Sequence, residues 1–235
     1  MGTSLEGLQT AGAAGPTVRV MVVGAGNVVL SQARWVGAGA ATVRAGARSC
    51  GVAAGTPLAA LADLHLAGGP SFALRDYGHC TSAPRDSGQL FVYSLDGETN
   101  HGQNGWEYKV ENRSGTTGAG DPTGTQGNGR LLASGAQVLW FWCQAFAGGC
   151  QRNLVVSASS SVPGGGVLRV RVTGYDNYGR GAAMSGARVR LGGSSAVTGG
   201  SGSATLRAPS RTGSYALTAS RPGSVPAFPM SVTVR

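Results

Sequence analysis

Charged residues make up only 12% of the 235-residue chain, and no apolar run approaches the roughly 18 residues that a membrane-spanning helix needs. The sequence therefore predicts no transmembrane segment, and a hydrophobic content of 41% excludes disorder driven by charge. The 41 glycines have no three-residue period, which excludes collagen. They also disfavour long helices, because each glycine costs about 1 kcal/mol relative to alanine. A chain rich in glycine, valine, serine and threonine is predicted to be mainly β.

Lysine is almost missing, and so are acidic residues in the last third of the chain. Lys109 is the single lysine beside eighteen arginines, and Asp176 is the only acidic residue beyond Leu154. Up to Leu154 there are ten basic and nine acidic residues, whereas nine arginines from Val155 onward give that part a net charge of +8. We expect two domains, residues 17–154 and 155–235, after a flexible leader of residues 1–16. Only the second domain would attract anions by its field.

Four cysteines are present, and none has the spacing of a zinc or redox motif. Cys143 and Cys150 flank a short loop and suit a closing disulfide, which leaves Cys50 to pair with Cys80. Disulfides favour an oxidising compartment, so we expect a secreted or cell-envelope protein; the alternative is four buried thiols in a cytosolic one. Residues 1–15 contain no recognisable signal peptide, and we expect either an incomplete start or a removed leader.

One helix is predicted in the first domain, at residues 57–66. Thr56 can cap it, Pro57 suits its first position, and Gly68-Gly69 ends it. Residues 114–130 are rich in glycine and are expected to form an exposed loop. Strands are expected at residues 18–23, 27–36, 71–77, 90–95, 106–110 and 138–143. One helix packed on a mixed sheet is an α+β layout of the β-grasp kind.

Short alternating strands separated by turn residues fill the second domain. They are expected at residues 167–172, 187–191, 204–206, 215–219 and 230–234. Regular spacing of short strands without helices predicts a β-sandwich. A hinge is expected near the boundary, in residues 157–161 and 163–166.

Residue patterns for catalysis or cofactor binding are sparse. Gly24-Ala25-Gly26 resembles the start of a dinucleotide fingerprint, but Val29 replaces the third glycine and the ribose-binding acid is missing. The three histidines lack metal-ligand spacing, and no GxSxG motif occurs. Asp86-Ser87-Gly88 and the pair Asp96 and Glu98 suit turns. The sequence therefore predicts no enzyme, no catalytic residue, no metal ligand and no cofactor.

Two sets of alternating residues are the candidate binding surfaces. In the first domain, a period of two gathers aromatic side chains on one strand face, as core or as the floor of a ligand site: Trp106, Tyr108, Trp140 and Trp142. In the second domain, the same period turns arginines outward, as a solvated surface or as one basic face for an anionic polymer: Arg169, Arg171, Arg188 and Arg190. This half lacks interleaved aromatic residues, so a nucleic-acid partner is not expected.

Residues 18–154 resemble an actinobacterial type of secreted bacterial domain family of uncharacterised function. The resemblance rests on Thr56–Leu61, Gly105–Val110, Gly135–Cys143 and the cysteine-bearing stretches 75–80 and 149–152. That family is related to the cobalamin-binding β-domain of transcobalamin and intrinsic factor, which implies a β-grasp fold and introduces a corrinoid as a ligand. The rest resembles a bacterial immunoglobulin-like domain, on residues 170–179, 186–191, 198–206, 213–215 and 232–234. Such domains commonly act as spacers or adhesive modules on cell surfaces.

Together these features predict a non-enzymatic, secreted or cell-surface binding or adhesion protein. Its expected partner is a cell-surface polymer or a protein ligand. The first alternative is capture of a small molecule such as a corrinoid by the β-grasp domain. The second alternative is a secreted enzyme.

Overall fold

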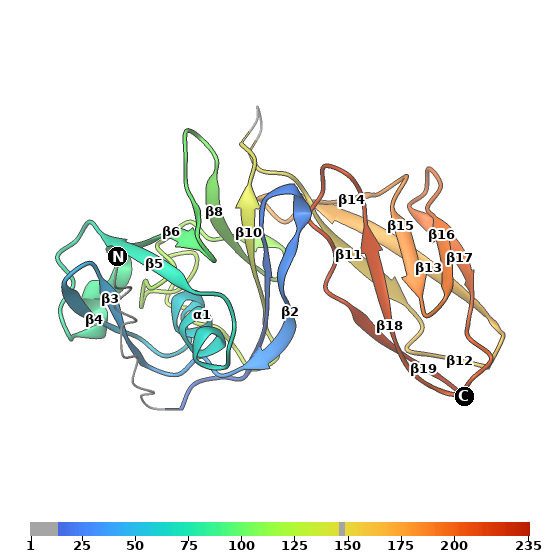
Figure 1. Ribbon diagram of the computed structural model, residues 1–235, viewed down its shortest axis with the longest axis horizontal. Coiled ribbons are helices and arrows are strands. Elements are labelled where there is room, and N and C mark those ends of the chain that lie inside the picture. The colour runs from blue at the N-terminus through green and yellow to red at the C-terminus, as the bar shows by residue number, and fades with distance from the viewer. Residues whose placement is uncertain (1–13, 146–148) are drawn as a thin grey trace, which may run out of the picture. The chain divides into compact units, whose positions relative to one another are not determined.

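The computed structural model describes residues 14–145 and 149–235. These residues form two compact units, an N-terminal unit that ends at Cys143 and a C-terminal unit that contains Gln144–Arg235 together with Ala25–Asn27 (Figure 1). Several β-sheets make up both units, which confirms the mainly β class. The domain limits of 17–154 and 155–235 stay predictions, because compactness does not test whether each part folds alone. The expected leader, residues 1–16, lies almost entirely outside the described residues.

A five-stranded sheet forms the centre of the N-terminal unit. From one edge to the other its strands are β2 (Val29–Val36), β1 (Val18–Val23), β10 (Gln137–Cys143), β8 (Gly105–Val110) and β9 (Arg113–Ser114). β1 and β10 run parallel, and the other neighbours are antiparallel. β1 is apolar except for Arg19, as expected for a strand that is covered on both faces.

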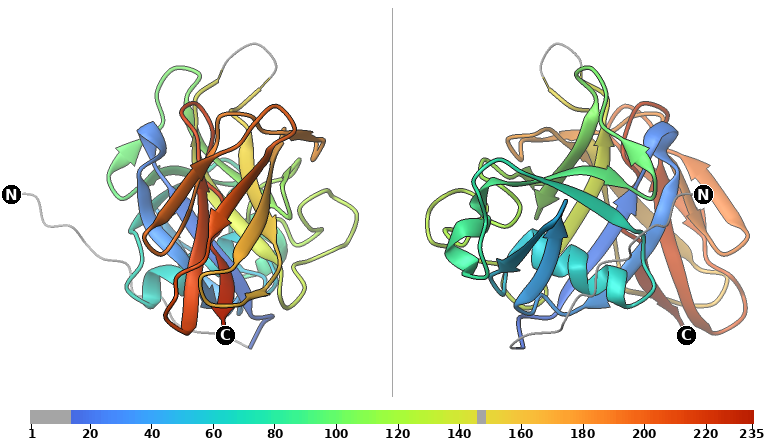
Figure 2. Two further views of the ribbon diagram at one scale, coloured as in Figure 1. Left: turned by 90° about the vertical axis from the view of Figure 1, so that its right-hand side faces the viewer. Right: turned by 60° about the vertical axis from the view of Figure 1, so that its left-hand side comes forward.

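The helix α1 (Pro57–Leu66) has the predicted limits. Thr56 caps it, because its hydroxyl oxygen accepts the backbone N–H of Ala59 at 3.2 Å. Leu58, Leu61 and other apolar side chains of α1 are fully buried, and α1 packs against β1, β2 and β3 (Ala41–Ala45) (Figure 2). No helix in the described part of the chain is long and apolar enough to cross a membrane.

Two small antiparallel sheets complete the N-terminal unit. They contain β3 with β4 (Arg48–Val52), and β5 (Phe72–Asp76) with β6 (Leu90–Leu95) and β7 (Glu98–Thr99). Asp96 and Gly97 both have positive φ, 51° and 81°, so the Asp96–Glu98 pair belongs to the tight turn between β6 and β7.

Both expected disulfides are present. Cys50 in β4 is joined to Cys80, which precedes the 3₁₀ helix η2 (Pro84–Gln89), and their Cα atoms are 5.4 Å apart. Cys143 and Cys150 are also disulfide-bonded, and no cysteine is free. The Cys50–Cys80 bond closes a loop of 30 positions that includes α1 and β5.

Residues 114–130 form a loop, as the sequence predicts, but only part of it is exposed, including residues 127–130. Ala119 is only 6% exposed, and its carbonyl accepts the backbone N–H of Leu58, one of the free donors at the start of α1. The carbonyl of Gly120 accepts the hydroxyl of the buried Ser87 at 2.5 Å. Hydrogen bonds to distant segments therefore hold this loop against the unit, and composition alone does not reveal them.

Two sheets packed around one core form the C-terminal unit. The first sheet contains β11 (Asn153–Ala158), β13 (Val167–Tyr175), β14 (Gly181–Ala183) and β17 (Ser203–Arg207). The second, in strand order, contains β12 (Ser161–Val162), β19 (Met230–Val234), β18 (Gly213–Ser220), β15 (Arg188–Leu191) and β16 (Ser194–Val197). The shared core includes Val170, Val189, Leu217 and Val232, and a two-sheet sandwich agrees with the sequence pattern.

The hinge expected in residues 157–161 and 163–166 is wrong for its first part. Ser157 and Ala158 belong to β11, which pairs with β13 along its whole length. Leu154 and Val156 are buried whereas Ser157 is exposed, so this segment is an ordinary amphipathic strand. The sequence predicts a hinge here because a run of serines is also typical of flexible linkers.

Candidate functional site

The four aromatic residues predicted as a ligand floor lie on one face of the central sheet. Trp140 is opposite Tyr108 and Trp142 is opposite Trp106 in the ladder between β10 and β8. The ring centroids of these pairs are 5.5 Å and 5.7 Å apart. All four side chains are at most 6% exposed. They pack as core, and they do not form the open platform that a large planar ligand would need.

Two hollows border this aromatic face. One, of about 230 Å³, lies between β6, β8, β10 and residues 115–119. The other, of about 310 Å³, lies at the turn between His101 and Asn104 and is also bordered by Phe91 and Trp106. Pockets for drug-sized ligands span roughly 300–1,000 Å³. A corrinoid is larger than such ligands, so neither hollow can enclose one.

The four arginines predicted as one basic face are divided between two sheets. Arg169 and Arg171 lie on β13, and Arg188 and Arg190 lie on β15 of the other sheet. Because the inner faces of both sheets meet in one core, their outward faces point away from each other. The prediction of a single basic face is therefore wrong. A period of two predicts whether a side chain points in or out, but it does not predict which sheet the strand joins.

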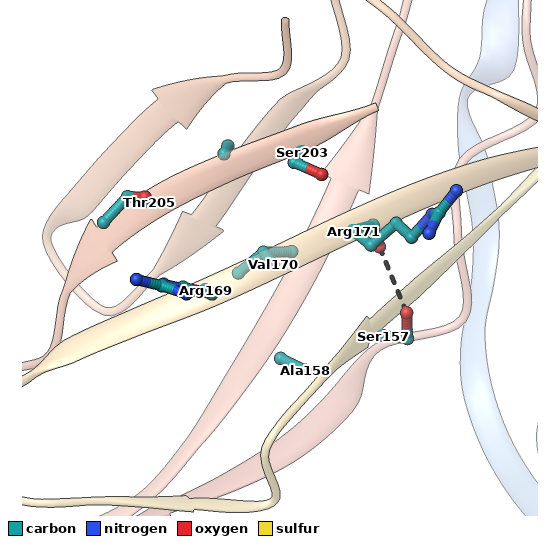
Figure 3. Close-up of a pocket in the computed structure, with 8 residues that line it drawn as sticks. Ser157, Ala158, Arg169, Val170, Arg171, Ser203 and Thr205 are labelled. Atoms are coloured by element: carbon teal, nitrogen blue, oxygen red, sulfur yellow. Dashed lines mark hydrogen bonds between the residues drawn. The ribbon is translucent and has the colours of Figure 1, made fainter. Parts of the chain in front are cut away.

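Arg169 and Arg171 border a shallow groove of about 490 Å³ on the outward face of β11, β13 and β17 (Figure 3). In the strand ladders, Arg171 is opposite both Ser157 and Ser203, and Arg169 is opposite Thr205. The hydroxyl of Ser157 donates to the backbone carbonyl of Arg171 at 3.5 Å. We call these five residues the β13 face: Ser157, Arg169, Arg171, Ser203 and Thr205. It combines two guanidinium groups with hydroxyls on the neighbouring strands.

Within residues 14–145 and 149–235, the charge of the β13 face has no acidic partner. Among the described residues, neither guanidinium group forms a hydrogen bond or an ion pair. Both side chains are exposed. They are therefore free to meet anions from solution.

The only acidic residue of the C-terminal unit, Asp176, is held within its own turn. Its carboxylate accepts the backbone N–H groups of Arg180 and Tyr178, each at 2.9 Å, and lies 3.9 Å from the guanidinium of Arg152. The hydrogen bond from Arg180, helped by the one from Tyr178 and by the charges of Arg152 and Arg180, lowers the pKa of Asp176 below its usual 3.8. This carboxylate stays ionised, and its charge is compensated locally.

A hydrolytic site is not apparent in the described part of the chain. Ser87 of the Asp86-Ser87-Gly88 tripeptide is fully buried, and its hydroxyl is directed to the carbonyls of Gly120 and Pro84. A hydroxyl in this position is not placed to attack an external substrate. The described residues also contain no group of three or more His, Cys, Asp or Glu that could hold a metal ion. The expected lack of enzymatic activity stays a prediction.

No protein-family model, no curated protein and no solved structure matches this chain. The resemblances to the transcobalamin-related family and to immunoglobulin-like domains therefore stay predictions.

Sequence reasoning missed the residues that complete both candidate sites. The hydroxyls of Ser157, Ser203 and Thr205 line the groove, and Leu90 and Val92 line the smaller hollow. A signal for Ser157 exists, because Leu154 and Val156 alternate with polar residues as in a strand. The other positions depend on which strands become neighbours, and the pattern of a single sequence does not predict which strands pair.

Proposed function

We propose that this protein is an extracellular, non-enzymatic binding protein that attaches to an anionic glycopolymer through the β13 face. The observation that carries the proposal is the pair Arg169 and Arg171, which are exposed on the outward face of a sheet, have no acidic partner among the described residues and are flanked by hydroxyls on both neighbouring strands. The +8 charge beyond Val155 would draw an anionic polymer toward this unit from a distance.

The chemistry of the β13 face suits sulfate, phosphate or carboxylate groups joined along a sugar chain. Guanidinium groups bind such anions through paired hydrogen bonds. Residues two apart on a strand are separated by about 7 Å, so Arg169 and Arg171 can contact successive anionic groups of a polymer. Serine and threonine hydroxyls can donate to and accept from sugar hydroxyls. A shallow, open groove favours an extended polymer over a small molecule, which needs a deeper enclosure.

Nucleic acid is the competing anionic polymer, and the composition of the groove argues against it. Proteins that bind single strands stack bases on aromatic side chains. The groove is lined by serine, alanine, arginine, valine and threonine residues only. A sheet face of this kind offers charge and hydroxyls but no stacking surface.

The extracellular location is supported by the disulfides, which persist in oxidising compartments. In the N-terminal unit, the parallel pairing of β1 with β10 and the presence of one α-helix among the described residues support the proposed β-grasp relationship. In the C-terminal unit, the two-sheet sandwich supports the proposed immunoglobulin-like relationship. These relationships would make the second unit the adhesive module.

The test compares two double variants of the full chain on immobilised heparin, a sulfated glycan. Arg169→Gln/Arg171→Gln removes the two charges of the β13 face. Arg188→Gln/Arg190→Gln removes two charges with the same spacing from the opposite sheet and is the matched control. Exposed ion pairs contribute about 0.2–1 kcal/mol each, so the first variant should weaken binding by roughly 2- to 30-fold, and by more than the control. The control should lose less than about threefold, by its change in net charge.

Two results would overturn the proposal. Equal losses in both variants would show that net charge, and not the β13 face, determines binding. Stronger retention on single-stranded DNA than on heparin at the same salt concentration would identify nucleic acid as the preferred polymer.

A further inference from the structure

The outward face of the sheet formed by β5 and β6 carries large aromatic side chains that are not part of the core. Tyr77 is 64% exposed and Phe91 is 41% exposed, and their ring centroids are 6.2 Å apart. Tyr93, two positions beyond Phe91, is half-buried. Exposed apolar surface is unfavourable in water, so a contiguous group of large aromatic side chains indicates a binding surface.

Strand pairing arranges these aromatic side chains in a row. Arg75 is opposite Phe91 in the ladder between β5 and β6, and the backbone N–H of Tyr77 donates to the carbonyl of Gln89 at 3.2 Å. The guanidinium carbon of Arg75 lies 4.8 Å from the ring centroid of Tyr93, a cation–π contact. Because residues two apart on a strand are separated by about 7 Å, the three rings follow one another along β6 over about 14 Å. We call these four residues the β6 face: Arg75, Tyr77, Phe91 and Tyr93.

A polar hollow adjoins this row. Phe91 also borders the hollow of about 310 Å³ at the turn between His101 and Asn104. Three further lining residues, His101, Gln103 and Glu107, are exposed. Their side chains form no hydrogen bond or ion pair with the residues that the structure describes. A neutral imidazole and an amide both donate and accept hydrogen bonds, and a carboxylate accepts them, so the hollow suits a ligand with hydroxyl groups.

We propose that the β6 face and this hollow bind a neutral glycan, a single chain of linked pyranose rings. The C–H groups of a pyranose pack against aromatic rings, whereas its hydroxyls donate and accept hydrogen bonds. The aromatic row suits the first property and the hollow suits the second. The planes of the Tyr77 and Phe91 rings differ by 50°. This angle favours a single chain over a flat crystalline surface, because a chain can turn at each glycosidic bond.

The charge and the hydrogen-bonding groups of the site disfavour two other extended ligands. Nucleic-acid binding depends on neutralising phosphates, whereas the ten basic residues up to Leu154 are balanced by nine acidic ones. Proline-rich peptides also dock on exposed aromatic rings, but proline has no N–H group to donate to acceptors such as the carboxylate of Glu107. The proposal does not rest on the β13 face, and its failure would leave the proposed binding of an anionic polymer untouched.

Calorimetric titration of the full chain with three neutral hexasaccharides tests the proposal: cellohexaose, chitohexaose and maltohexaose. We expect saturable binding of at least one of them. Its affinity should change little between low and high salt, because the ligand carries no charge. Heparin binding by the β13 face should weaken with salt, so this difference separates the two sites.

Tyr77→Ala removes one ring of the β6 face, and Tyr178→Ala is the matched control. Tyr178 is a similarly exposed tyrosine, at 70%, and it belongs to the C-terminal unit. The first variant should weaken binding of the hexasaccharide by roughly 2- to 10-fold, as expected for one lost aromatic contact, and the control should leave it unchanged. Gln103→Ala should cause a loss of similar size, because one hydrogen bond contributes about as much.

The three substituted side chains are exposed, so the urea unfolding midpoints should stay unchanged and confirm that the variants are folded. The proposal is overturned if none of the three hexasaccharides binds, or if Tyr77→Ala and Tyr178→Ala weaken binding equally. Decaproline is the competing probe. If it binds more tightly than every hexasaccharide and loses affinity in Tyr77→Ala, the ligand of the β6 face is a proline-rich peptide and not a glycan.

Discussion

Removal of the Cys50–Cys80 disulfide gives a quantitative test of how the N-terminal unit is stabilised. The bond closes 30 positions of chain, and loop-closure entropy predicts a stabilisation of about 3.6 kcal/mol for this length. Cys143 and Cys150 are separated by only seven positions, and the same relation gives about 2.4 kcal/mol for them. Cys50→Ala/Cys80→Ala should therefore cost more free energy of unfolding than Cys143→Ala/Cys150→Ala, by about 1 kcal/mol.

Tryptophan fluorescence during urea unfolding is the appropriate assay. All four tryptophans, Trp35, Trp106, Trp140 and Trp142, belong to the N-terminal unit, so the signal reports that unit alone. Cys50, Cys80 and Cys143 are at most 6% exposed, whereas Cys150 is half-buried, so loss of side-chain packing adds to the cost of the Cys50→Ala/Cys80→Ala variant. The expected difference has the same sign from loop length and from packing. Equal losses in the two variants, or a loss below about 1 kcal/mol for the longer loop, would refute the entropic account.

Two further predictions concern Ser87 and Asp176. Ser87→Ala should destabilise the N-terminal unit by about 1–3 kcal/mol, because the carbonyl of Gly120 loses a buried donor; an unchanged urea midpoint would contradict this packing. The lowered pKa of Asp176 stabilises the fold above pH 3.8, and this contribution disappears as the pH falls through the lower folded-state value. Asp176→Asn should remove this part of the acid-side loss, as followed by circular dichroism; identical acid titrations of both proteins would contradict the assignment.

Local signals explain the parts of the fold that the sequence predicts well. α1 has the expected limits because its capping residue, its first proline and its terminal glycines all act within a few positions of the helix ends. β1 likewise coincides with its β-branched run at residues 18–23. The alternating pattern correctly predicts that the side chain of Arg169 points outward and that the side chain of Val170 points into the core.

Non-local pairing explains the failures. Arg188 and Arg169 have the same local pattern, yet β15 pairs with β18 whereas β13 pairs with β17, so the two arginines belong to different sheets. Residues 114–130 look like a solvent loop because their contacts, to Leu58 and Ser87, come from segments far back in the chain. The sequence therefore predicts only some of the residues of each candidate site, because the other residues lie on neighbouring strands and loops.

The parallel pairing of β1 with β10 also constrains how this chain can fold during synthesis. Arg19 pairs with Gln137, more than a hundred positions later, so one side of β1 has no partner until the ribosome has delivered β10. Contacts of such long range are associated with slow folding. The Cys50–Cys80 loop is complete much earlier and can close while the central sheet is still open. An oxidising compartment would thus act on this protein before its core is assembled, and premature release of the chain would expose the apolar edge of β1 to aggregation.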